Sequence, residues 1–333
     1  MIRVAIAIVS YNVQSLLRRC LHSIERHAGG AGYIVETIVV DNASSDGSAA
    51  LVAAEFPAVR LLASAANLGF TGGNNLALWV LGFPVAAPAA GGGAARGADP
   101  PDFVLLLNPD AELTPGALPQ LVDYLATHPA AAICGPQLRY GDGRFQHGAF
   151  RFPGLGQVAL DVLPVAGLPA VHRLFDSRIN GRYPAALWQG GAPFPVDFVL
   201  GAAMLVRGAA ITQVGGLDDG YWMYCEEMDW CLRMREQGWR VAAAPAAVVV
   251  HHEGQSSRQR RWRSFEQLWR SRYRFFALHR GHYPAGFTPA LRSLVRLGMM
   301  LQARQARADF EAGRVTGSEL GDALAAFATV ARL

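Results

Sequence analysis

Short apolar runs alternate along the first half of the chain with segments of helical periodicity. Buried strands are predicted for the apolar runs at 4–9, 34–40, 59–62 and 103–107. Helices are predicted where apolar positions recur every three or four residues, at 16–24, 49–56, 74–81 and 115–127. Strands that alternate with helices form a parallel sheet, so the pattern predicts an α/β fold with a mostly parallel central sheet flanked by helices.

The second half of the chain is less regular. A strand region at 196–206, a short helix at 209–214, a helix at 226–237 and a strand at 248–250 continue the α/β pattern. Residues 83–101 are rich in Ala, Gly and Pro and predict a flexible surface insertion, while 139–195 yield no assignment. From residue 262 onward the chain reads as helical. The pattern thus predicts an α/β domain over 1–257 and a helical C-terminal extension over 258–333.

Composition supports a packed core and divides the charge unevenly. Of the 333 residues, 51% are hydrophobic and 17% charged, which excludes a disordered chain. Residues 251–333 hold 14 Arg against six acidic residues, and the remainder holds 16 Arg against 20. The basic end is compatible with contact to an anionic membrane or phosphate, and equally with a solvated helical face.

Cysteine usage and hydropathy indicate the compartment. The four cysteines form no close CxxC pair, so a zinc site is not expected. The first residues do not resemble a signal peptide, and no run of about 18 apolar residues free of charge predicts a spanning helix. We therefore expect a cytoplasmic protein with reduced thiols.

Polar residues cluster where the predicted strands end, which is where ligands bind in parallel α/β sheets. These clusters are Ser10-Tyr11-Asn12, Asp41-Asn42 and Asn108-Pro109-Asp110. Neither a glycine-rich dinucleotide fingerprint nor a GxxxxGK[ST] phosphate loop is present, so a nucleotide would have to bind in another way.

Functional interpretations are possible for these segments, and structural alternatives exist for two of them. Asp41 could accept hydrogen bonds from a base or ribose, or the segment could be a turn capped by Ser45 or Asp46. The glycine-bearing loop 67–75 could bring backbone amides close to a phosphate. Asp110 has the hard oxygens that suit Mg²⁺ or Mn²⁺, although the preceding Asn-Pro dipeptide is also typical of a plain turn.

Three acidic residues crowd the start of the helix predicted at 226–237. Glu226, Glu227 and Asp229 would each gain about 0.3–1 kcal/mol from the helix dipole, which would explain one or two of them. Aromatic neighbours favour a partly dry pocket, in which a carboxylate with a raised pKa can act as a general base. His251 follows a strand and could complete a metal site, or it could be structural.

Taken together, these segments resemble the family-2 glycosyltransferases with the GT-A fold, most closely their bacterial rhamnosyltransferase-like branch. The resemblance runs from residue 9 to residue 256 and is carried by seven stretches in the family's order: VSYN, VVDNASSDGS, NLGFTGGNN, LLLNPDAEL, FVLGAAMLVRGAAITQVGGLDD, MYCEEMDWCLRMREQGW and VVVHHEGQS. It makes 1–257 the catalytic domain.

The resemblance implies a role for each donor-side cluster. Asp41 is expected to contact the nucleobase; the nucleoside pocket is expected to be lined by Ser10, Tyr11 and Asn12, and the nucleotide sugar by Asn67 and Gly69. Asp110 corresponds to the last acid of the family's DxD metal motif. Asn108 replaces the first Asp of that motif, which leaves one charge fewer, and is grouped with the donor-binding residues.

On the acceptor side, Glu227 corresponds to the second acid of the family's ED motif, the general base, with Glu in place of Asp. Glu226 and Asp229 are supporting catalytic candidates. His251 corresponds to a position that can ligate the divalent cation, Mg²⁺ or Mn²⁺. The neighbouring His252 is the alternative ligand.

The implied activity is metal-dependent transfer, with inversion, of a sugar from a nucleotide diphosphate donor to an acceptor hydroxyl in cell-surface glycan or polysaccharide synthesis. Likeness to the rhamnosyl branch suggests dTDP-rhamnose, with other donors left open. The expected partners are this donor and a glycan or lipid-linked acceptor. The C-terminal region is expected to contact the inner face of the cell membrane. No binding of nucleic acid is expected. The alternatives are a nucleotidyltransferase and an inactive nucleotide-sugar-binding protein.

Overall fold

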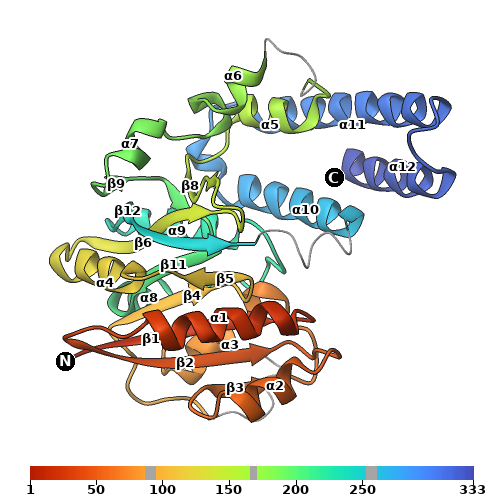
Figure 1. The fold of residues 1–333 in the computed structure, drawn as a ribbon. Helices are drawn as coiled ribbons and strands as arrows, with labels where there is room; N and C mark the ends of the chain where they lie inside the picture. Colours follow the sequence, from red (N-terminus) through yellow and green to blue (C-terminus); the bar gives the residue numbers. More distant parts are fainter. Residues whose placement is uncertain (87–94, 166–170, 253–260) are drawn as a thin grey trace. The chain divides into compact units, whose positions relative to one another are not determined.

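The computed structural model of the chain (Figure 1) describes residues 1–86, 95–165, 171–252 and 261–333. The chain divides into two compact units. The first comprises Met1–Phe150, Ala185–Trp222 and Glu226–Ser256. The second comprises Arg151–Pro184, Met223–Cys225 and Ser257–Leu333.

A ten-stranded sheet, as counted over the described residues, is the centre of the first unit. Its first half is parallel, in the order β3 (Arg60–Ala63), β2 (Tyr33–Asp41), β1 (Ile2–Ser10) and β4 (Phe103–Leu107). The register of β1 and β2 sets Ser10 beside Asp41, the last residue of each strand.

The second half of the sheet mixes directions. From β4 the order continues with β11 (Ala203–Arg207), β6 (Ala131–Arg139), β12 (Arg240–His251) and β5 (Ala111–Leu113). β11 is antiparallel to both of its neighbours, and β12 is parallel to β6, so β12 runs in the same direction as β1, β2 and β4. Two short strands attach here: β7 (Phe145–Gln146) pairs with β6, and β9 (Phe194–Pro195) pairs with β12. A separate two-stranded sheet is formed by β8 (Ala149–Phe150) and β10 (Phe198–Val199). The predicted mostly parallel central sheet is confirmed.

Helices cover both faces of the parallel sheet, which is why its central segments, β4 and residues 4–9 of β1, are continuously apolar. The helices of the first unit are α1 (Gln14–His27), α2 (Ser48–Glu55), α3 (Gly69–Val80), α4 (Ala117–Thr127), α7 (Ala185–Gln189), α8 (Gly208–Val214) and α9 (Glu226–Glu236). Alternate residues of β1, from Val4 to Ile8, share a buried core with α1, α2 and α4. Val9 points to the opposite face, where it meets Gly73 of α3. The two faces are visible in Figure 1, where α1 and α3 lie on opposite sides of β1 and β2.

The flanks of the predicted 83–101 insertion are held against the first unit. The Gly97 N–H donates to the Val80 carbonyl oxygen at 3.0 Å, and Arg96 donates to the Gly82 carbonyl at 3.0 Å. Arg3 forms an ion pair with Asp99. Residues 87–94 lie outside the described residues, so the flexibility of the insertion stays a prediction.

The second unit is helical, as the pattern from residue 262 predicts. It contains α5 (Leu155–Val162), α6 (His172–Phe175), α10 (Arg261–Leu278), α11 (Phe287–Glu311) and α12 (Gly317–Arg332), with short 3-10 turns η2 (Arg178–Asn180) and η4 (Arg280–His282). α11 packs on α12 and α5, and α10 packs on α12. Thr316 and Glu319 form a capping box that fixes the start of α12. Within the described ranges, none of the helices combines the length and hydropathy needed to cross a bilayer.

Candidate active site

The carboxyl ends of the parallel strands bring the predicted site residues to one edge of the sheet. β1 ends at Ser10, β2 at Asp41 and β12 at His251, and Asn108 follows β4 directly. These strands all run in the same direction, so their ends meet at the same edge, where α/β sheets bind ligands. The sheet topology therefore gathers side chains that lie up to about 240 positions apart in the sequence.

Three buried polar side chains at the ends of β1 and β2 have an atom without a hydrogen-bond partner among the described residues. They are the Ser10 hydroxyl, Asp41 Oδ1 and Asn42 Oδ1. The other oxygen of Asp41 accepts from the Ser44 N–H at 3.0 Å, and the Asn42 amide donates to the Gly69 carbonyl at 2.9 Å. An unsatisfied buried polar atom costs about 1–3 kcal/mol. Three such atoms together are the arrangement expected of a site that a polar ligand completes.

Asn12 joins the loops that follow β1 and β2. Its side-chain oxygen accepts from the Ser45 N–H at 2.7 Å, and its own N–H donates to the Ser44 hydroxyl at 3.1 Å. Asn12 has φ of 53°, in the left-handed region that Asn tolerates well. Its neighbour Tyr11 is partly exposed. Asp46 adds to this connection, because its carboxylate accepts from the backbone N–H groups of Gln14 and Ser48.

The loop before α3 is closely packed. Asn67 accepts from the Gly69 N–H at 2.9 Å through its side-chain oxygen, which forms a turn. Gly69 has φ of 72°, and the next N–H, of Phe70, donates to the Trp222 carbonyl at 3.0 Å. A Cβ atom at Gly69 would overlap that same Trp222 carbonyl. This position accepts only glycine.

We expect Gly69→Ala to destabilise the first unit by at least about 2 kcal/mol. The left-handed conformation alone costs a non-glycine residue about 1–2 kcal/mol, and the overlap with Trp222 adds to it. Urea unfolding measures the effect. Gly29→Ala is the matched control, because a Cβ at Gly29 meets nothing within 4 Å. Equal stability of the two variants would contradict this description of the loop.

Asp110 and His251 form the candidate metal centre. His251 Nε2 lies 3.4 Å from Asp110 Oδ1, and both side chains are largely buried. His251 Nδ1 donates to the side-chain oxygen of Gln146 at 3.2 Å, which leaves Nε2 facing the carboxylate. Two ligands about 2.1 Å from a shared Mg²⁺ or Mn²⁺ would be roughly 3 Å apart. The pair therefore fits a divalent cation in its spacing and in its donor atoms.

His252 points to a different partner, as expected of the next residue along an extended strand. Its Nε2 lies 2.7 Å from Glu112 Oε1, and Arg19 forms an ion pair with the same carboxylate at 2.6 Å. Its backbone N–H donates to the Asp110 carbonyl at 2.9 Å and helps to fix that loop. Of the two histidines, the geometry favours His251 as the ligand. Glu253–Ser256 lie outside the described residues.

Asn108 is held through its main chain. Its N–H donates to the Ala202 carbonyl at 2.9 Å, and its own carbonyl accepts a weak hydrogen bond from the buried Cys20 thiol at 3.7 Å. These contacts fix the loop between β4 and Asp110 while the side chain remains partly exposed.

Glu226 and Glu227 begin α9 with perturbed acidities. Burial and the neighbouring Glu227 charge raise the pKa of Glu226 well above its ordinary value. Burial raises the pKa of Glu227 to about 7, against an opposing effect of main-chain N–H groups that include Gly201. The Oε2 atom of each glutamate has no hydrogen-bond partner within the described part of the chain. Burial thus favours the neutral form of Glu226, while Glu227, with a pKa of about 7, can accept a proton near neutral pH.

Asp229 is engaged in a structural contact. Its carboxylate is buried and accepts from Arg233 Nε at 2.7 Å, one helical turn along α9. Arg233 also donates to the Gly216 carbonyl at 2.8 Å. The pair holds α9 to the loop that follows α8.

The backbone just before α9 is strained. Tyr224 and Cys225 have φ of 70° and 67°, values that side-chain-bearing residues rarely adopt. Each such residue costs about 1–3 kcal/mol and persists only where its surroundings impose it, most often at functional sites.

Sequence reasoning gave no role to three residues of this site. Gln146 lies in the stretch that gave no assignment, so no signal pointed to it. Gly201 contributes only its backbone N–H, which no side-chain pattern reveals. Asn42 was named in the strand-end cluster with Asp41 but received no role, and its burial is what distinguishes it.

Comparison with known proteins agrees with this arrangement. The family model described as "Glycosyltransferase like family 2" matches residues 3–274. The N-acetylglucosaminyl-diphospho-decaprenol L-rhamnosyltransferase of Mycobacterium tuberculosis is 32% identical over 273 residues, which cover 81% of this chain and 84% of the relative. The rhamnosyltransferase WbbL of Escherichia coli is 36% identical over 85 residues, or 26% of this chain and 32% of that protein.

Solved structures share the fold at low identity. The mannosyltransferase PcManGT from Pyrobaculum calidifontis, in complex with GDP-Man and Mn²⁺, has a TM-score of 0.55 and 18% identity, covering 99% of this chain and 81% of its own. GalNAc-T7 with UDP, GalNAc and Mn²⁺ has a TM-score of 0.52 and 14% identity, covering 75% of this chain and 44% of its own.

Proposed function

Because the chain belongs to glycosyltransferase family 2 and has the GT-A fold, we propose that it moves a sugar from a nucleoside diphosphate donor to an acceptor hydroxyl with inversion, using a divalent cation. Three features of the same unit support this together. Glu227, in the first turn of α9, has a pKa of about 7, and an Asp–His pair and unsatisfied buried polar atoms lie at the carboxyl edge of the sheet. The family membership favours a glycosyltransferase over the nucleotidyltransferase alternative.

The donor we propose is dTDP-rhamnose. The family relatives named above from Mycobacterium tuberculosis and Escherichia coli are rhamnosyltransferases by name. In this chain, Asp41 Oδ1, Asn42 Oδ1 and the Ser10 hydroxyl are the buried groups that would take hydrogen bonds from the nucleoside. Asn67 and Gly69 shape the adjoining loop.

Asp110 and His251 would hold the cation, Mg²⁺ or Mn²⁺. The two solved structures above contain Mn²⁺, and the 3.4 Å spacing of this pair suits either ion. When bound, the cation stabilises the negative charge that grows on the leaving diphosphate. Asn108 in place of a second carboxylate leaves more of the coordination to phosphate oxygens and water.

Glu227 is the proposed general base. Its Oε2, which no described residue hydrogen-bonds, can take the proton of the acceptor hydroxyl as that oxygen attacks the anomeric carbon. The raised pKa of Glu226 disfavours a second negative charge beside the base. Asp229 positions the helix through Arg233. One base and a direct displacement leave no role for an enzyme nucleophile, so the configuration at the anomeric carbon inverts.

A thermal-shift panel of dTDP, UDP, GDP and ADP, each with Mn²⁺ or with EDTA, tests the proposal. A ligand at about 100 times its dissociation constant adds about 2.7 kcal/mol of stability. We expect stabilisation by dTDP that depends on Mn²⁺. Stabilisation by no nucleoside diphosphate would overturn the proposed function.

For the acceptor we propose a lipid-linked glycan, reached from the membrane surface by the second unit. The named substrate of the Mycobacterium tuberculosis relative is a diphospho-decaprenol. Residues 267–308 of this chain contain eight Arg and no Asp or Glu. On α11 the apolar Leu297 and Met300 are 45% exposed, beside the exposed Arg296 and Arg304. Apolar side chains among basic ones suit an anionic lipid surface.

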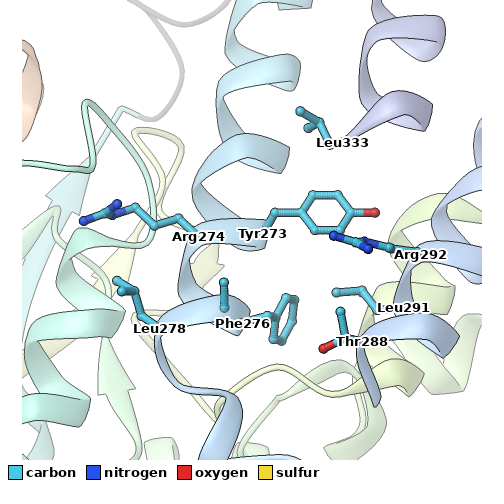
Figure 2. A pocket seen from close by; sticks show the side chains of 9 residues that line it. Tyr273, Arg274, Phe276, Leu278, Thr288, Leu291, Arg292 and Leu333 are labelled. Carbon is cyan, nitrogen blue, oxygen red and sulfur yellow. The ribbon is translucent and has the colours of Figure 1, made fainter. Parts of the chain in front are cut away.

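An open pocket of about 350 Å³ lies within this unit, between the end of α10 and the start of α11 (Figure 2). Its lining is formed by Tyr273, Arg274, Phe276, Ala277, Leu278, Thr288, Leu291, Arg292 and Leu333. Figure 2 shows the Tyr273 ring and the Arg292 guanidinium side by side, with apolar side chains next to them. The pocket adds apolar surface and a positive charge to the proposed lipid-facing unit.

Reversing charge on α11 is expected to weaken vesicle binding at least tenfold. Each Arg near an anionic surface contributes about 1 kcal/mol, so Arg304→Glu with Arg307→Glu removes two attractions and adds two repulsions. Co-sedimentation with vesicles of phosphatidylglycerol and phosphatidylcholine measures it. The control is Arg26→Glu with Arg60→Glu, two exposed positions of the first unit. Equal loss in both variants would mean nonspecific attraction, and no loss would remove the membrane proposal.

A further inference from the structure

Gln146 is a buried polar residue whose side chain contacts the candidate metal ligand. It is 4% exposed and lies on β7, which pairs with β6 next to β12 in the sheet. Its side-chain oxygen is 3.2 Å from Nδ1 of His251, whose Nε2 is 3.4 Å from Asp110. The three side chains thus form a line from the β6–β7 ladder to the metal centre.

We propose that Gln146 is a positioning residue that holds the His251 imidazole in the tautomer and orientation able to bind the divalent cation. This inference rests on the proposed function, which makes His251 a ligand. A neutral imidazole has one N–H and one lone pair. When Nδ1–H donates to the Gln146 oxygen, the lone pair of Nε2 is directed to the Asp110 side, where the cation would bind.

The adjacent histidine supplies an internal comparison. His252 has its own partner, Glu112, which also binds Arg19. Each imidazole is therefore oriented by a different side chain, and the two partners can be changed separately. Outer-sphere hydrogen bonds of this kind typically change metal affinity 10–100-fold when removed.

Mn²⁺ binding to the full chain in the presence of dTDP tests the proposal. Electron paramagnetic resonance measures free Mn²⁺ for the affinity, and pulsed resonance detects the ¹⁴N coupling of a bound imidazole. We expect Gln146→Leu to weaken Mn²⁺ affinity 10–100-fold and to reduce the ¹⁴N coupling. Gln146→Glu keeps an acceptor oxygen and should retain both. Glu112→Gln changes the shared partner of His252 and Arg19, leaves the His251–Gln146 contact in place, and is the matched control.

The outcomes separate this inference from the proposed function. Unchanged affinity and coupling in Gln146→Leu would overturn the role of Gln146 while leaving the metal site intact. A wild-type protein without ¹⁴N coupling, or with coupling that survives His251→Ala, would overturn the metal assignment and the role of Gln146 with it. If Gln146→Leu does not fold, Gln146→Met, which also lacks the acceptor oxygen, carries the same test. If Gln146→Glu also lost Mn²⁺ binding, the acceptor oxygen would not be sufficient and the effect would come from disturbed packing. That result would also contradict the proposal.

Discussion

Glu227→Gln is expected to lower kcat by a factor of about 10²–10⁴, the usual contribution of a general base. The amide keeps the size of the side chain but cannot take the acceptor proton. Donor binding should remain, because the groups proposed to hold the nucleoside lie at the ends of β1 and β2. Steady-state transfer kinetics measure the first effect, and calorimetric titration with dTDP measures the second.

Glu226→Gln is the matched control for that substitution. Burial and the neighbouring Glu227 charge raise the pKa of Glu226 well above its ordinary value, which favours the neutral form that the amide resembles. Activity should stay within a few-fold of wild type. The free energy of unfolding at pH 8 should rise, since burial disfavours the ionised carboxyl in the fold but not in the unfolded chain. If Glu226→Gln abolished transfer and Glu227→Gln did not, the base would be Glu226.

The pH dependence of wild-type transfer follows from the same acidity. Glu227 accepts a proton only in its ionised form, and burial raises its pKa to about 7. We expect kcat/KM to level off above that pH and to fall about tenfold per pH unit below it. A profile that stays flat down to pH 5, near the ordinary pKa of a glutamate, would contradict the assignment.

The second large effect is expected at the metal centre. Asp110→Asn removes the negative charge that faces His251, and we predict a drop in kcat/KM of at least about 100-fold, equivalent to about 2.7 kcal/mol. Mn²⁺-dependent stabilisation by dTDP should disappear in a thermal-shift assay, while the fold remains. Asp142→Asn is the control, because Asp142 is a half-exposed acid of the same unit and pairs with Arg144. Full activity of Asp110→Asn would exclude Asp110 as a ligand.

Much of the parallel half of the sheet could be predicted, because its central strands β1 and β4 are largely buried on both faces and form continuous apolar runs. β6 was missed because Gly135 and Pro136 interrupt its middle. The fold explains the glycine, since a Cβ there would lie 2.7 Å from Val199. β12 was predicted over three residues and spans twelve, since its first part is rich in alanine and carries a register shift after Ala244.

The start of α3 shows a different limit. The glycines after Asn67 indicated a loop, and the helix was predicted to start five residues after its actual first residue, Gly69. Gly73 allows α3 to pack closely on β1, because a Cβ at this position would lie 2.6 Å from Val9. The sequence does not reveal whether a glycine is needed for a turn or for the close approach of a helix and a strand.

The candidate site could be predicted where chemistry resides in side chains at strand ends. Asp41 and Asp110 were selected on that ground, and Glu227 was selected because three acidic residues crowd the start of a helix. The choice between His251 and His252 depends on which face of β12 each occupies, and therefore on the register of the strand. Gln146 reaches the site through strand pairing across more than 100 residues, and no local pattern encodes such a contact.

The measurement that tests the central claim most directly is the stereochemistry of transfer. The protein would be incubated with dTDP-rhamnose, Mn²⁺ and an N-acetylglucosaminyl diphospholipid acceptor, and the product analysed by NMR. A single displacement with Glu227 as base predicts release of dTDP and a new glycosidic bond of anomeric configuration opposite to that of the donor. A product that retains the donor configuration would contradict the proposed mechanism.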